Sequence, residues 1–155
     1  MKRPLLVILL MLAVGFPAVR ADARPRAYFI TPTWGRLTSP LGWRPDPFRP
    51  EVRQHHWGID IAAAPGTPVL ASAPGTVQYS GAYAGYGSTV YIYHGAGWAT
   101  VYAHLSAIRV QPGLHVRQGA VIGAVGSEGR STGPHLHFEI RYMNQPVDPL
   151  KYLGR

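Results

Sequence analysis

Hydrophobic and polar residues alternate along this chain in short runs, and glycine and proline residues separate the runs. Regularly spaced short runs that are bounded by turn residues are typical of an all-β sandwich or barrel. No stretch of about 12 residues has a helical period, so we expect little helix. The predicted strands are Thr76–Tyr79, Thr89–Tyr93, Trp98–Ala103, Ala120–Val125 and Leu136–Tyr142. Residues 44–54 are rich in proline and arginine, and we interpret them as a loop.

The first residues of the chain have the pattern of an export signal. Lys2 and Arg3 precede an apolar run over residues 5–16, and small residues follow Pro17. A basic start, a short apolar stretch and small residues at the cleavage point define such signals. We therefore expect a periplasmic or extracellular protein. The predicted segments are a signal peptide over 1–21, an N-terminal arm over 22–36 and one domain over 37–155.

Composition narrows the classes of function. The chain has 155 residues, of which 46% are hydrophobic and 14% charged, and this excludes a disordered tail. Cysteine is absent, which excludes disulfides, thiolate zinc sites and a cysteine nucleophile. The only lysines are Lys2 and Lys151, which argues against a biotinyl- or lipoyl-carrier module. The net charge of +8 permits an anionic partner, but export argues against nucleic acid.

Histidine supplies the candidate chemistry, because the chain has seven histidines and several of them cluster. His56 stands four residues before Asp60. These positions lie about 13 Å apart in an extended strand, so a shared metal ion requires the sharp turn that Gly58 permits. His135 and His137 lie on one face of a predicted strand, about 7 Å apart. One of them can bind a metal ion while the other faces a substrate.

The candidate metal site is His56, Asp60 and His137. Two histidines and one carboxylate fit a catalytic zinc site whose fourth position is open to water. Zinc lowers the pKa of that water to about 7. The residues available as general base, or as stabilisers of a charged intermediate, are His104 and His135.

Two neighbouring side chains have open interpretations. Glu139 shares the face of His135 and His137, where it either orients a ligand histidine or forms an ion pair with Arg141. We favour the ion pair. Tyr102 stands two residues before His104, so we expect it on the same face and toward the substrate.

These motifs resemble the zinc metallopeptidases of the lysostaphin/LytM type, peptidase family M23. The resemblance covers about residues 37–150, and the joint order and spacing of the segments make it specific. The resembling segments are His56–Ala62, Gly66–Val69, Gly85–Gly87, Tyr102–Ser106 and Gly126–Glu139.

The resemblance implies an antiparallel β scaffold with an active-site groove. It implies that the zinc ligands are His56, Asp60 and His137, and that His104 and His135 are the catalytic histidines. The implied function is a zinc-dependent endopeptidase that hydrolyses peptide cross-links of bacterial peptidoglycan, with Zn²⁺ as its cofactor. The expected partners are stem peptides or cross-bridges of peptidoglycan.

The alternative is a non-catalytic regulator of the same fold that binds the cell wall or activates an amidase. All five residues of the implied site are present, which favours the enzyme. Because only a short arm over 22–36 precedes the predicted domain, we expect an open site. We also expect a monomer that has no stable membrane anchor after the signal is cleaved.

Overall fold

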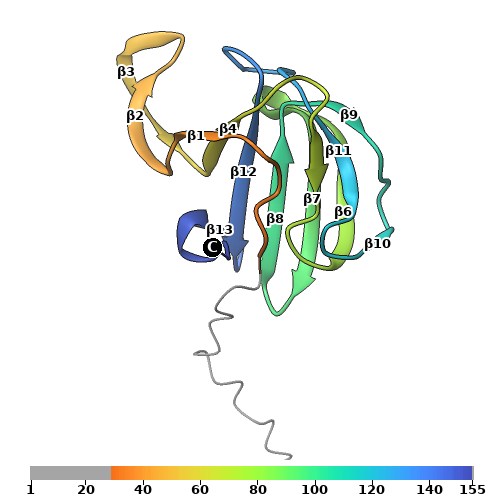
Figure 1. Ribbon diagram of the computed structural model, residues 1–155. Helices are drawn as coiled ribbons and strands as arrows, with labels where there is room; N and C mark the ends of the chain where they lie inside the picture. The colour runs from red at the N-terminus through yellow and green to blue at the C-terminus, as the bar shows by residue number, and fades with distance from the viewer. Residues whose placement is uncertain (1–28, 155) are drawn as a thin grey trace, which may run out of the picture.

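The computed structural model describes residues 29–154, and antiparallel strands make up most of it (Figure 1). Among these residues there are only two short 3-10 helices, η1 and η2, which confirms the all-β prediction. The elements are β1(Arg36–Ser39), β2(Gly42–Asp46), β3(Arg49–His56), β4(Ile59–Ala62), β5(Pro68–Leu70), β6(Gly75–Tyr83), η1(Ala84–Tyr86), β7(Gly87–Gly95), β8(Trp98–Ala103), β9(Leu105–Ile108), β10(His115–Val116), β11(Val121–Val125), β12(His135–Tyr142), β13(Gln145–Val147) and η2(Pro149–Lys151).

The largest sheet has eight strands, and β12 lies inside it. Its order is β1-β4-β12-β8-β7-β6-β10, and β13 also pairs with β12. A three-stranded sheet has the order β5-β11-β9, and β2 and β3 form a separate hairpin. Figure 1 shows this hairpin projecting from the edge of the molecule next to β4.

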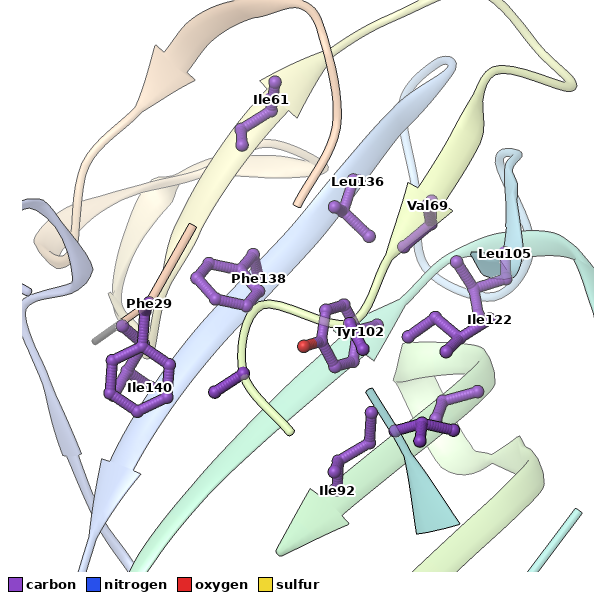
Figure 2. Close-up of a cluster of buried hydrophobic side chains, with 14 of the residues drawn as sticks. Phe29, Ile61, Val69, Ile92, Tyr102, Leu105, Ile122, Leu136, Phe138 and Ile140 are labelled. Atoms are coloured by element: carbon purple, nitrogen blue, oxygen red, sulfur yellow. The ribbon is translucent and has the colours of Figure 1, made fainter. Parts of the chain in front are cut away.

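The hydrophobic core joins the large sheet to the three-stranded sheet. Alternation along β12 turns Leu136, Phe138 and Ile140 into the core, where each is fully buried. They belong to one cluster with Val69 of β5 and Ile122 of β11 (Figure 2). The other face of β12 is therefore left for the polar side chains between them.

All five predicted strands are present, and β8 has the predicted bounds. The loop predicted over residues 44–54 is wrong, because this segment forms most of the β2–β3 hairpin. The carboxylate of Asp46 accepts hydrogen bonds from the backbone N–H groups of Phe48 and Arg49 and so closes the turn. Proline is tolerated here because a two-stranded ribbon has free edges.

The described part of the chain begins inside the fold. Phe29 is fully buried and forms a β-bridge with Leu153. The predicted signal peptide over 1–21 and the first residues of the predicted arm lie outside the described residues, so these boundaries stay predictions. Within residues 29–154, none of the helices has the length and apolarity needed to cross a bilayer.

Candidate metal centre and active site

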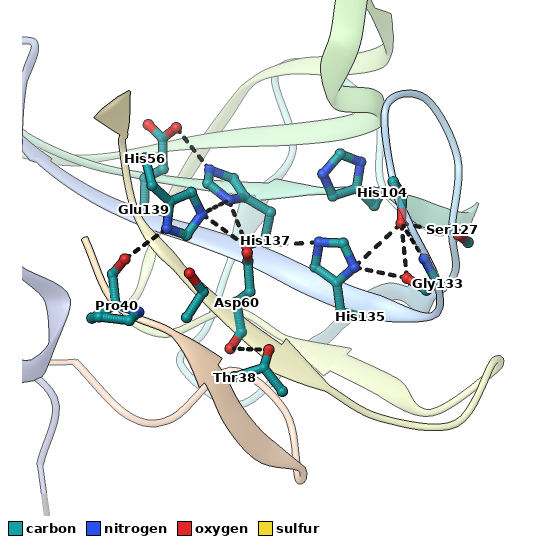
Figure 3. A network of polar contacts seen from close by, with 12 residues as sticks. Thr38, Pro40, His56, Asp60, His104, Ser127, Gly133, His135, His137 and Glu139 are labelled. Atoms are coloured by element: carbon teal, nitrogen blue, oxygen red, sulfur yellow. Dashed lines mark hydrogen bonds and ion pairs between the residues drawn. The ribbon is translucent and has the colours of Figure 1, made fainter. Parts of the chain in front are cut away.

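The five polar side chains singled out from the sequence converge across β4, β12 and the end of β8 (Figure 3). His56 ends β3 and Asp60 lies on β4, while His135 and His137 lie on β12. His104 directly follows the last residue of β8. Antiparallel pairing of β4 with β12 sets Asp60 opposite His137, although 77 positions separate them in the chain.

The short connection between β3 and β4 brings His56 next to Asp60. Gly58 lies in this connection, where a Cβ atom would stand 2.2 Å from the carbonyl oxygen of Phe138. A larger residue would therefore push the connection away from β12. The turn predicted at Gly58 is present, and close approach to β12 is the reason that it needs glycine.

Three ligand atoms form a nearly equilateral triangle. His56 Nε2 lies 2.9 Å from Asp60 Oδ1 and 3.0 Å from His137 Nδ1. His137 Nδ1 lies 3.0 Å from Asp60 Oδ1. An ion about 2 Å from each atom, the usual zinc–ligand distance, fits a triangle of this size. All three side chains are buried.

The hydrogen bonds that His56 and His137 make outside the triangle determine which nitrogen of each ring carries a proton. The other nitrogen of each ring faces the triangle. His56 Nδ1 lies 2.8 Å from the carbonyl oxygen of Pro40, which can only accept, so this nitrogen carries a proton. His137 Nε2 lies 3.0 Å from Glu139 Oε1 and donates to it in the same way. When both rings are neutral, as metal ligands must be, the two inner nitrogens and Asp60 Oδ1 present their electron pairs to one shared point. Three electron-pair donors so close together fit a bound cation.

Electrostatics at the triangle also favours positive charge. Burial by itself would raise the pKa of Asp60, but hydrogen bonds with His137 and His56 hold this pKa well below its usual range. Burial would lower the pKa of His137, but the Asp60 and Glu139 carboxylates outweigh burial and raise this pKa. The site therefore holds a carboxylate that stays ionised and attracts a cation.

His104 and His135 lie beside the triangle with their rings together. Their ring centroids are 4.8 Å apart, and His135 Nε2 lies 3.6 Å from Asp60 Oδ1. His104 donates through Nδ1 to the carbonyl oxygen of Glu128, and His135 donates through Nδ1 to that of Gly133. Burial lowers the pKa of His104 to about 4. His104 is therefore neutral near pH 7, and its free Nε2 can accept a proton.

Glu139 makes both of the contacts that the sequence left open. Its Oε1 accepts from His137 Nε2 at 3.0 Å and from the Tyr86 hydroxyl at 2.6 Å. Its Oε2 accepts from Arg141 Nε at 2.6 Å. Glu139 is fully buried, and these donors lower its pKa although burial opposes ionisation. The preferred ion pair is confirmed, and the same carboxylate also orients the ring of His137.

Arg44 was missed as a site residue, because it was assigned to a solvated loop. It lies on β2, and one of its terminal nitrogens stands 3.1 Å from Asp60 Oδ2. The same nitrogen donates to the hydroxyl of Ser39. Arg44 thus holds the oxygen of Asp60 that points away from the triangle. Only the hairpin, which the sequence did not reveal, brings this side chain to the site.

The expectation that Tyr102 faces the substrate is wrong. Tyr102 is fully buried, and its hydroxyl accepts a hydrogen bond from the backbone N–H of Ser72. His104 has a φ of 61°, in the left-handed region that residues other than glycine seldom adopt. This conformation breaks the strand alternation between positions 102 and 104, so His104 faces the site while Tyr102 packs in the core.

The other three histidines stand apart from the triangle. Both ring nitrogens of His94 are hydrogen-bonded, one to the Pro74 carbonyl and the other to the Thr100 hydroxyl. His115 is exposed. His55 packs between Trp43 and Trp57 on the surface of the hairpin, with ring centroids 5.5 and 4.3 Å away.

A cavity of about 340 Å³ opens over the five residues. The β2–β3 hairpin forms one wall and the segment before β12 forms another. A salt bridge joins these walls, since Arg130 contacts both carboxylate oxygens of Asp46 at 2.6 Å. Arg130 also donates to Gln54 at 3.1 Å. The arrangement offers a polar, walled site for a substrate next to a cation site.

Comparison with known proteins places this geometry in a family. The family described as peptidase family M23 matches residues 54–149, which include all five side chains of the site. Among solved structures, a zinc-containing peptidase from Vibrio cholerae superposes with a TM-score of 0.72 at 35% identity. That alignment covers 83% of this chain and 41% of the other.

Two curated relatives have different descriptions, one as a peptidase and one as an activator. The DD-carboxypeptidase/endopeptidase Mpg of Neisseria meningitidis is 53% identical over 115 residues, which cover 74% of this chain and 26% of Mpg. The murein hydrolase activator NlpD of Escherichia coli is 42% identical over 97 residues, which cover 62% of this chain and 25% of NlpD. The chain thus spans about a quarter of the length of these relatives.

Proposed function

The chain belongs to peptidase family M23, and from this premise we propose that it is a zinc-dependent endopeptidase. Its proposed substrates are the peptide cross-links of bacterial peptidoglycan. The observation that carries the proposal is the triangle of His56 Nε2, His137 Nδ1 and Asp60 Oδ1, with two further histidines beside it. This set holds the ligands and the proton-transfer groups that a hydrolytic zinc site needs.

The cofactor assignment follows from the donor atoms. Two imidazole nitrogens and one carboxylate oxygen suit zinc better than magnesium or calcium, which prefer all-oxygen sites. Bound zinc would supply Lewis acidity, which polarises a peptide carbonyl and activates water for attack. Glu139 and the Pro40 carbonyl fix the two ligand rings through their outer nitrogens.

The proton-transfer steps are assigned to His104 and His135. Each donates Nδ1–H to a backbone carbonyl, so each presents an unprotonated Nε2 when neutral. One takes the proton of the attacking water, and the other stabilises charge that develops on the carbonyl oxygen. The cavity of about 340 Å³ gives the peptide access to both rings.

The alternative function is that of an M23-fold regulator that binds the cell wall or activates an amidase. The similarity to the murein hydrolase activator NlpD supports it. The complete set of five side chains supports the enzyme instead. Export by the predicted signal would place either protein where peptidoglycan is found.

Digestion of purified peptidoglycan sacculi tests the proposal. The protein is incubated with sacculi in the presence of zinc or of a chelator, and the products are identified by mass spectrometry. We expect chelator-sensitive loss of cross-linked dimers, and the masses of the products identify the peptide bond that is cleaved. Zinc-loaded, folded protein that cleaves no sacculus type would contradict the enzyme. Release of stem peptides only when an amidase is added would establish the regulator.

A further inference from the structure

A second cavity, of about 560 Å³, lies beside the metal centre. Trp57, Tyr83 and Tyr86 line both cavities, so the two lie side by side. The second cavity lies over the large sheet, on strands β6, β7, β8, β12 and β13. A peptide whose carbonyl lies at the metal centre can therefore extend into it.

Strand alternation puts this cavity and the metal centre on the same face of β12. His137 and Arg141 are four positions apart and so point to the same side, while Ile140 between them is buried in the core. Val101 of β8 lines the cavity, whereas its neighbour Tyr102 faces the core. The cavity therefore lies on the face of the large sheet that points away from the core.

The lining combines aromatic rings with a single charge. Four tyrosines and Trp57 supply most of the wall, and Arg141 is the only charged residue among the side chains that line it. Aromatic walls bind alkyl chains and peptide planes, while a guanidinium binds a carboxylate through two parallel hydrogen bonds. The lining therefore complements a ligand that has one carboxylate on an apolar stem.

Arg141 is held in place while part of it stays available. Its Nε donates to the buried Glu139 at 2.6 Å, which fixes the plane of the guanidinium. Its side chain retains 28% exposure. The hydrogen bond to Glu139 uses Nε alone, and the Tyr86 hydroxyl also interacts with the guanidinium. The two terminal nitrogens are the donors that a carboxylate ligand requires.

We propose that this cavity is a subsite for a carboxylate-bearing residue of the peptide substrate, with Arg141 binding the carboxylate and the tyrosine rings binding the stem. The proposal deepens the peptidase function proposed above and rests on it. The carboxylate can be the C-terminus of a stem peptide or the side-chain carboxylate of a diamino diacid within it. Both present the same group to Arg141, and the test separates them.

The test uses matched synthetic peptides that differ only in one carboxylate. One pair has a C-terminal acid or a C-terminal amide, and a second pair has a free or an amidated side-chain carboxylate. We expect one of the two acids to be cleaved with kcat/KM about 10- to 100-fold above its amide, mostly through KM, because one charge-assisted interaction is lost in the amide. The pair that shows the preference identifies the carboxylate.

Two variants test whether the cavity causes the preference for the acid peptide over its amide. Arg141→Gln removes the charge, so we expect the ratio between acid and amide to fall toward one. Because this change also affects Glu139, the zinc content is measured alongside. Gln145→Glu adds a carboxylate to the exposed rim of the cavity and should lower the same ratio. Gln111→Glu, an equal change of charge at an exposed site outside the cavity, should leave the ratio unchanged.

Binding separates the failure of this proposal from the failure of the peptidase function. The affinities of the same peptides for the protein are measured by calorimetry, which needs no turnover. A preference in binding without any cleavage would uphold the subsite and overturn the peptidase. Cleavage without a preference for either acid would overturn the subsite alone. Tighter binding of a peptide-free disaccharide than of any acid peptide would assign the cavity to glycan instead.

Discussion

At the scale of single residues, the distance to Asp60 distinguishes the proposed ligand histidines from the proposed catalytic histidines. His56 and His137 each donate one ring proton outward, to Pro40 and Glu139, and turn the other nitrogen to Asp60. His104 and His135 also donate outward, but their free nitrogens lie beside the triangle. The same residue type therefore has two proposed roles, which the distance to Asp60 separates.

Substitution of single histidines should separate these roles. We expect His135→Ala to keep bound zinc but to lose turnover by about 100-fold or more, because general acid–base groups contribute that much. His137→Ala should lose both zinc and turnover. Zinc content by elemental analysis and cleavage of sacculi are the two measurements. His115→Ala, at an exposed position, is the control. A His135→Ala protein without zinc, or with full activity, would contradict the assignment.

Glu139 should act on the metal site without touching the metal. Glu139→Gln keeps the shape but removes the charge that Arg141, Tyr86 and His137 share. We expect zinc affinity to fall by about 10- to 100-fold, the usual effect of removing an outer carboxylate partner. Competition with a chelator measures this affinity. Affinity equal to that of the unchanged protein would mean that Glu139 serves the fold alone.

At the scale of elements, the β2–β3 hairpin forms a wall of the site through very few tertiary contacts. Asp46 at its turn binds Arg130, which lies before β12, and Arg44 on β2 reaches Asp60. Phe48 lies under the Arg130 guanidinium, 4.8 Å from ring centroid to Cζ. The position of the hairpin therefore depends on ion pairs rather than on a large apolar interface.

The ion pair between Asp46 and Arg130, which we call the tether of the hairpin, should weaken in acid. The hydrogen bond from Arg130 lowers the pKa of Asp46 to about 2, from a usual value of 3.8. A lowered carboxyl pKa stabilises the folded state above pH 3.8, and the contribution is lost as pH falls toward 2. We expect hydrogen exchange in β2 and β3, corrected for the intrinsic rate, to rise between pH 4 and pH 2 before exchange in β8 does.

A variant reproduces the acid effect at neutral pH. Asp46→Asn should raise exchange in the same two strands at pH 6, because the tether loses its charge. Glu51→Gln changes the charge equally at an exposed position of β3 and is the matched control. Equal protection of the hairpin in the Asp46→Asn variant and the control would show that the tether does not hold it.

At the scale of the whole molecule, the candidate metal centre joins parts that the core does not join. The three candidate ligand side chains belong to β3, β4 and β12, and so connect the hairpin to the large sheet. A cation can bind at this centre only when the chain is folded, because the three side chains lie far apart in an extended chain. Metal binding should therefore add to the stability of the whole fold.

Thermal unfolding with and without metal measures this contribution. At a zinc concentration about 100-fold above Kd, mass action adds about 2.7 kcal/mol to the free energy of unfolding. For a domain of this size, Tm should rise by about 10 °C. Magnesium should cause no comparable shift, because it prefers oxygen ligands. The shift should disappear in His137→Ala, and an equal shift in that variant would place the zinc elsewhere.

The short-range features of this protein can be read from its sequence alone. The strand positions follow from alternation of neighbouring residues, and β8 was predicted with its bounds for that reason. The five candidate site residues were also predicted from the sequence, through short motifs such as His56–Asp60 and His135–His137 and through the family resemblance. The β2–β3 hairpin was not predicted, because Pro45 and Pro50 lie inside its strands and proline argues against a strand.

The contacts between distant segments, by contrast, follow from the three-dimensional fold. Arg44 meets Asp60 because the hairpin folds back, and Tyr86 meets Glu139 across 53 positions. The positive φ of His104 reverses the side on which Tyr102 was expected, and no pattern of neighbouring residues encodes that angle. Side-chain partners and cavity walls arise from packing between strands that are remote in the chain, so alternation along one strand cannot specify them.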